Sequence, residues 1–285
     1  MRIDRKRGEI NIIPHKPNYL SSANSKEMES CKSRRYWEVD AVRGISLLGM
    51  IFFHTFFLLG TFHVISISVW EWICNYIWLG TSIFVIIAGV SLILRHGRMA
   101  NKPRKDYYAA IVKRGIQIIL IGVGIAVVAS VFIHFAIGDG RYMYFNFLQM
   151  MGWSMILCIP FLRLGKWNFI PAVLLIALGL FLETVSGPAY LMPFGILPDG
   201  FYPRDYFPIL PWIGVMLLGV ALGSVLYPNG YRKWSIPDGG RAGEILAKIG
   251  KYPLQIYVLH LPIIGAVILL MIEITTLLGC PIGYL

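Results

Sequence analysis

The chain carries seven long apolar stretches, each sufficient to cross a hydrocarbon core of about 30 Å as a helix. It is 56% hydrophobic and only 14% charged, with a mean hydropathy of +0.65, which is too apolar for a soluble globular protein. Continuous apolar runs are not typical of a membrane β-barrel, whose strands alternate. We therefore predict an all-α integral membrane protein, a bundle of about seven transmembrane helices. The predicted spans are Ala41–Phe62, Val69–Leu94, Ala109–Ile137, Phe145–Leu164, Trp167–Val185, Tyr206–Leu226 and Tyr252–Ile274.

The basic residues fall almost entirely on one side of the predicted bundle. The net charge is +11, and of the 26 lysines and arginines only Arg43, Arg141 and Arg204 lie outside the segments that share this side. By the positive-inside rule, the N-terminus is cytoplasmic and the C-terminus lies outside. We interpret the positive charge as the signal that orients the chain in the cell membrane, and we expect no binding of nucleic acid.

Residues 1–35 precede the first span and are polar and basic, without the apolar core of a signal peptide. We predict a flexible cytoplasmic tail over residues 1–35 and one transmembrane domain over residues 36–285. The four cysteines do not show the spacing of metal ligands, so we expect no metal site.

Three ionisable residues stand within or at the start of the first span, on one helical face. At about 100° per residue, Arg43 and His54 fall within about 20° of each other, and Asp40 lies about 40° from His54. A charged group at bilayer depth costs several kcal/mol, so such residues usually line a cavity enclosed by protein. The alternative is an ion pair at the helix start with a hydrogen-bonded core histidine.

Polar residues also form stripes on two other spans, which we expect to face the same cavity. The stripes are Glu71, Asn75, Trp78 and Ser82 in the second span and Asn146, Gln149 and Trp153 in the fourth. Ordinary hydrogen bonding between helices is the alternative for each stripe. In the sixth span, Gly219 and Gly223 predict close packing against another helix.

Histidines are the side chains best suited to exchange a proton near neutral pH. His54 is predicted in the outer half of the bilayer, His63 lies at the outer mouth, and His260 stands just before Pro262 in the last span. A histidine that binds a carbonyl left unpaired by this proline is the structural alternative for His260.

The first span opens with Asp-x-x-Arg-Gly and continues as an apolar run to His54. The further motifs, in chain order, are Ile87–Ser91, Lys113–Gly115, Asp205–Trp212 and Ile256–Pro262. As an ordered set over residues 35–265, they resemble the bacterial and archaeal relatives of heparan-alpha-glucosaminide N-acetyltransferase. Two positions depart from that pattern: Leu58 stands where relatives often have aspartate, and Gln149 where they often have histidine.

The resemblance implies that residues 36–285 form a membrane acyltransferase domain. Such an enzyme takes acetyl from cytosolic acetyl-CoA, its co-substrate, and transfers it to an amine or hydroxyl of a sugar on the outer side. The candidate catalytic residues are His54, His63 and Asp40. His63 is included because the lysosomal enzyme's catalytic histidine lies beyond its first span, which makes His63 a second possible counterpart of that histidine. The candidate donor-binding residues are Arg43, Lys113, Arg114 and His260. The candidate acceptor-binding residues are Asn146, Gln149, Asp205 and Tyr206.

Other readings of the same residues stay open. A small-molecule or proton-coupled transporter would use Asp40, Arg43, His54 and His260 as a relay, and a membrane scaffold would use none of them for chemistry. The cationic residues Arg43, Lys113 and Arg114 could equally anchor helices to anionic headgroups. The sequence also leaves open whether the protein is a homodimer. It leaves open two reaction routes as well: direct transfer of acetyl to the acceptor, and transfer through an acetyl-histidine intermediate.

Overall fold

A computed structural model describes residues 35–66, 69, 72–73, 75–99, 103–137, 143–201, 203, 205–280 and 282. It divides the chain into two units, Met1–Tyr36 and Trp37–Leu285, and all of the described helices belong to the second. The predicted tail, residues 1–35, lies outside the described residues except for Arg35.

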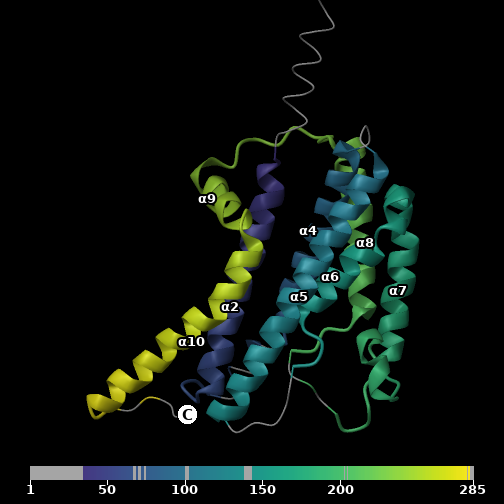
Figure 1. The fold of residues 1–285 in the computed structure, drawn as a ribbon. Coiled ribbons are helices and arrows are strands. Elements are labelled where there is room, and N and C mark those ends of the chain that lie inside the picture. Colours follow the sequence, from purple (N-terminus) through teal and green to yellow (C-terminus); the bar gives the residue numbers. More distant parts are fainter. Residues whose placement is uncertain are drawn as a thin grey trace, which may run out of the picture. The chain divides into compact units, whose positions relative to one another are not determined.

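The described part of the second unit is almost entirely helical and contains no strand (Figure 1). The α-helices are α2 (Trp37–Thr61), α4 (Ile77–Arg98), α5 (Arg104–Ile137), α6 (Phe147–Leu157), α7 (Phe169–Leu182), α8 (Ile209–Leu226), α9 (Gly240–Gly250) and α10 (Pro253–Leu277). The 3₁₀-helices are η1 (Pro160–Asn168), η2 (Ala189–Phe194) and η3 (Pro228–Gly230). Six segments in this part are long and apolar enough to cross a membrane. The prediction of an all-α integral membrane protein is confirmed.

The fourth predicted span forms a short helix followed by a tighter one. The 11 residues of α6 rise about 16 Å, which is too little to cross the bilayer alone. The chain keeps helical dihedral angles at Cys158 and Ile159 and continues as η1, and the seven residues through Leu164 add about 14 Å at the 3₁₀ rise. Gly165, with φ 54° and ψ −124°, then ends this rise and turns the chain toward α7.

Glycines set the closest helix contacts. The most extensive contact joins α4 and α8, where a Cβ on Gly89 would clash with the Met216 carbonyl and a Cβ on Gly219 with the Ile86 carbonyl. Gly223 packs in the same way against Ile93. The predicted close packing at Gly219 and Gly223 is therefore confirmed, and the main apolar core lies along this contact and α6.

The first spanning helix has its own partners. α2 packs most extensively on α9, and to a smaller and equal extent on α10 and α4 (Figure 1). Its first turn is held by Arg232, which donates from Nε and from one terminal nitrogen to the Glu38 carboxylate, while the Tyr227 hydroxyl donates to the same group over 3.1 Å. These contacts tie the start of α2 to the segment after α8.

Candidate active site

A cavity of about 360 Å³ lies between α2 and α4. Phe147 of α6, Phe207 of the loop before α8 and Tyr257 of α10 contribute to its wall. The volume is near the lower end of the range for small-molecule sites, about 300–1,000 Å³. The full lining consists of Ser46, Gly49, Met50, Phe52, Phe53, His54, Trp72, Ile73, Tyr76, Ile77, Gly80, Thr81, Phe84, Phe147, Asp205, Phe207 and Tyr257.

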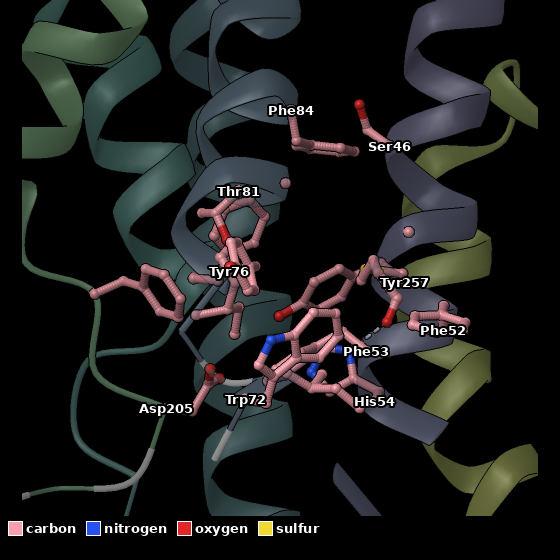
Figure 2. Close-up of a pocket in the computed structure, with 17 residues that line it drawn as sticks. Ser46, Phe52, Phe53, His54, Trp72, Tyr76, Thr81, Phe84, Asp205 and Tyr257 are labelled. Atoms are coloured by element: carbon pink, nitrogen blue, oxygen red, sulfur yellow. Dashed lines mark hydrogen bonds between the residues drawn. The ribbon is translucent and has the colours of Figure 1, made fainter. Parts of the chain in front are cut away.

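The two ends of the cavity differ in polarity (Figure 2). His54 and Asp205 lie at one end, and Ser46 lies at the other, eight residues or about 12 Å earlier on α2. The Ser46 hydroxyl donates to the Val42 carbonyl and the Thr81 hydroxyl to the Ile77 carbonyl, so each is already bonded to its own helix. The groups suited to acid–base chemistry are therefore concentrated at the His54 end.

His54 is paired with a second histidine from α10. Nε2 of His260 lies 3.2 Å from Nδ1 of His54. Nδ1 of His54 is also 2.9 Å from the Met50 carbonyl oxygen, and Nδ1 of His260 is 2.6 Å from the Tyr257 carbonyl oxygen. His260 is only 5% exposed, and its ring lies edge-on to that of His54. Sequence separates these histidines by 206 residues, and the packing of α10 on α2 brings them together.

These contacts define where the protons of a neutral pair lie. A carbonyl oxygen only accepts, so Nδ1 of His260 carries a proton and donates it to Tyr257, which leaves Nε2 as an acceptor. Nδ1 of His54 then donates to the Met50 carbonyl and to Nε2 of His260. The remaining nitrogen, Nε2 of His54, carries a lone pair and has no hydrogen-bond partner in the described part of the chain. This arrangement suits a general base.

Asp205 belongs to the loop between α7 and α8 and reaches the same end of the cavity (Figure 2). Its backbone has a left-handed φ of 47°, an uncommon conformation for a residue other than glycine. Burial raises the pKa of its carboxyl group from 3.8 to about 7. No lysine or arginine is among the described lining residues, so a carboxylate here faces a wall without a countercharge.

Arg43 lies outside the cavity, one turn before Ser46 on α2. Its guanidinium donates to Asp40 over 2.6 Å, to the Gly250 carbonyl over 3.1 Å and to the Ser91 hydroxyl over 2.7 Å. The side chains of Arg43 and Asp40 are 17% and 9% exposed. This ion pair therefore joins α2 to α4 and to the end of α9, and uses three of the five N–H groups of Arg43.

The other predicted donor-binding residues lie elsewhere. Lys113 and Arg114 are exposed on α5, whose main contact is with α6. No described contact joins them to Arg43. His260, in contrast, contacts the His54 ring, but it is not itself among the residues that line the cavity.

Three of the predicted acceptor-binding residues have structural contacts. Asn146 caps α6 by accepting from the Gln149 backbone N–H over 3.1 Å, and its Nδ2 donates to the Gly122 carbonyl over 2.7 Å. The Gln149 side chain is buried in the same region. The Tyr206 hydroxyl donates to the Met192 carbonyl and so closes the loop beside η2. Of the four predicted residues, Asp205 alone lines the cavity.

The remaining catalytic candidates are separated from the histidine pair. Asp40 lies 14 residues before His54, or about 21 Å along α2, and does not line the cavity. His63 follows the end of α2 with φ 55° and is exposed. Among these candidates, the structure therefore brings only His54 to the cavity.

The prediction that the polar stripe of the second span faces the cavity is wrong. Glu71 lies outside the described residues, and Asn75, Trp78 and Ser82 are not among the residues that line the cavity. The wall is formed instead by Tyr76, Gly80 and Phe84, at spacings of four residues. The spacing of these aromatic and small residues could have revealed this face, but a search for polar residues passes over it.

Among the described residues, no group of three His, Cys, Asp or Glu side chains is placed to hold a metal ion. The absence of a metal site stays a prediction.

The comparison with known protein families gives a match over most of the chain. A family model described as heparan-alpha-glucosaminide N-acetyltransferase, catalytic, matches residues 35–262. The matched region contains α2, α4 to α9 and the His260 end of α10, and so includes every described residue that lines the cavity. No curated protein and no solved structure matches the chain.

Proposed function

The chain belongs to the heparan-alpha-glucosaminide N-acetyltransferase catalytic family, a family of acetyltransferases, and from this premise we propose the reaction of its cavity. The protein is an integral membrane acetyltransferase that uses acetyl-CoA as donor and an amine or hydroxyl of a sugar as acceptor. The observation that carries the proposal is His54, which lines a cavity inside the helical bundle and is hydrogen-bonded to His260.

In the proposed reaction, Nε2 of His54 is the general base. The acceptor nitrogen or oxygen attacks the thioester carbonyl carbon, and the carbon–sulfur bond breaks as the new bond forms. The acceptor proton passes to Nε2 of His54 and then to the departing CoA sulfur, so the products are the acetylated sugar and CoA. His260 is a positioning residue, because its hydrogen bond holds the proton of His54 on Nδ1 and leaves Nε2 unprotonated.

The donor enters from the Ser46 end of the cavity in this proposal. Arg43 lies one turn beyond that end, and two of its N–H groups are not used by Asp40, Gly250 or Ser91. Arginine binds phosphate through paired donors, so Arg43 is the first candidate contact for the CoA phosphates. Lys113 and Arg114 are exposed on α5, and they remain secondary candidates for binding the CoA phosphates.

The acceptor is placed at the opposite end, beside Asp205. Asn146 and Tyr206 support this end through helix capping and loop closure rather than through the cavity wall. The cytoplasmic N-terminus, the cell membrane as location and a homodimer are further parts of the proposal that rest on the sequence.

The transporter alternative makes a different use of the same residues. Arg43 and His54 are 11 residues apart on α2, or about 16 Å, and no described hydrogen bond joins the Asp40–Arg43 pair to the histidine pair. A relay through all four residues would need groups to connect the two pairs.

The test is release of CoA by purified protein in nanodiscs. We expect the protein to bind acetyl-CoA and to release CoA at a rate that rises when glucosamine is added. Absence of acetyl-CoA binding would overturn the proposal. Movement of a labelled solute across sealed vesicles without consumption of acetyl-CoA would support the transporter instead.

A further inference from the structure

The cavity is open on one side, between α2 and α4. Phe52 and Trp72 line it and yet are 58% and 64% exposed. Gly49 on α2 and Gly80 on α4 are also exposed, and a Cβ on either would meet nothing within 4 Å. Both helices are long and apolar enough to span the membrane, so this side opening faces the hydrocarbon core.

The surface beside the opening is apolar on both helices. Ile45, Leu48 and Phe52 form an exposed stripe on α2, and Leu79 and Ile83 are exposed on α4. The Ser46 and Thr81 hydroxyls donate to carbonyls of their own helices, so they offer no donor to an occupant. The wall between Ser46 and His54 therefore suits a hydrocarbon chain.

The polar end of the cavity is the end nearer to the C-terminus of α2. His54 lies seven residues, or about 10 Å, before that end, and Asp205 of the loop before α8, Trp72 and Tyr76 line the cavity with it (Figure 2). Tryptophan and tyrosine are the residues enriched at membrane–water interfaces. From there the apolar wall runs about 12 Å into the bundle, which is within one leaflet of a hydrocarbon core of about 30 Å.

We propose that the acceptor is a sugar attached to a hydrocarbon chain. Its head binds at His54 and Asp205, and its chain leaves through the side opening between Gly49 and Gly80 and lies against the exposed apolar residues of α2 and α4. This inference rests on the proposed function, since it names the class of acceptor for the same cavity.

The test compares two acceptors with one head, glucosamine and dodecyl glucosaminide, by CoA release in nanodiscs. We expect kcat/KM in the wild type to be at least roughly tenfold higher for the dodecyl compound. Partition into the lipid alone could produce that preference, so the decisive variants are Gly49→Leu and Gly80→Leu, which fill the opening. In both, the ratio of the two kcat/KM values should fall by about tenfold.

Gly124→Leu is the matched control. Gly124 is an exposed glycine of α5, its Cβ would also meet nothing within 4 Å, and it does not line the cavity. Its ratio should equal that of the wild type. A ratio that is preserved in Gly49→Leu and Gly80→Leu, or that falls equally in Gly124→Leu, overturns the inference.

A binding measurement without acetyl-CoA separates this inference from the proposed function. Dodecyl glucosaminide should raise the Tm of the wild type and of Gly124→Leu more than that of Gly49→Leu. Equal Tm shifts in all three overturn the side opening as a binding site. Absence of CoA release with both acceptors, alongside unequal Tm shifts, overturns acetyl transfer and leaves the lipid-binding site in place.

Discussion

Helix α2 carries two polar pairs that differ in what they leave unbonded. In the Asp40–Arg43 pair the guanidinium is bonded to a carboxylate, a hydroxyl and a carbonyl on three helices or their ends. In the His54–His260 pair both Nδ1 atoms and the His260 Nε2 are bonded, and Nε2 of His54 has no described partner. The first pair joins packed helices, whereas the second pair includes a residue, His54, that lines the cavity.

The difference shows that an ionisable residue in a membrane helix is not by itself a sign of chemistry. Arg43 and His54 share a helical face, yet Arg43 mainly joins α2 to its neighbours, whereas His54 has a nitrogen available to a substrate. Substitutions at the first pair should therefore change stability most, and substitutions at the second should change turnover most.

The largest effect is expected from His54→Ala. Loss of a general base lowers kcat by about 10²- to 10⁴-fold, while loss of the hydrogen bonds to Met50 and His260 costs about 1–2 kcal/mol of stability. CoA release and thermal unfolding of the same preparation measure both quantities. The matched control is His134→Ala, which changes an exposed histidine of α5 outside the cavity lining and should turn over like the wild type.

Asp40→Ala should have the opposite profile. It leaves the partly buried Arg43 guanidinium without its carboxylate, and we expect the free energy of unfolding to fall by about 3 kcal/mol. Unfolding followed in mild detergent measures the loss. A stability equal to that of the wild type would contradict the structural role of the pair.

His260→Leu tests whether this histidine acts through His54. We expect kcat to fall about tenfold, the value of one hydrogen bond, with little change in the KM for acetyl-CoA. His260→Gln retains an oxygen that can accept from Nδ1 of His54 and should recover much of the loss. Equal activity of the leucine and glutamine variants would show that the contact is not needed to orient His54.

A further effect is expected at Asp205, as a dependence of stability on pH. Because the pKa of Asp205 rises from 3.8 to about 7 on folding, the folded state binds more protons between these values, and stability falls as the pH rises from about 4 to about 7. In Asp205→Asn this part of the pH dependence should vanish. Thermal unfolding of both proteins over this range is the measurement, and identical profiles would contradict the shift.

The sequence was sufficient for most of the spans, because apolar length and helical spacing are local properties, but it assigned the wrong face of the second span to the cavity. It predicted the Gly219 and Gly223 contact for the same reason. It did not predict that His260 meets His54, since the contact depends on how α10 packs on α2. A sequence search for polar residues also missed the wall at Tyr76, Gly80 and Phe84, because an apolar cavity between helices looks like ordinary lipid-facing surface in sequence.

The most direct test of the central claim, that Nε2 of His54 takes the acceptor proton, is chemical rescue of His54→Ala. Acceptor-dependent CoA release by this variant is measured with and without added imidazole, which can enter the space left by the side chain. We expect turnover reduced by about 10²-fold or more without imidazole and a saturable increase when it is added. Turnover of His54→Ala equal to that of the wild type, without imidazole, would contradict the claim.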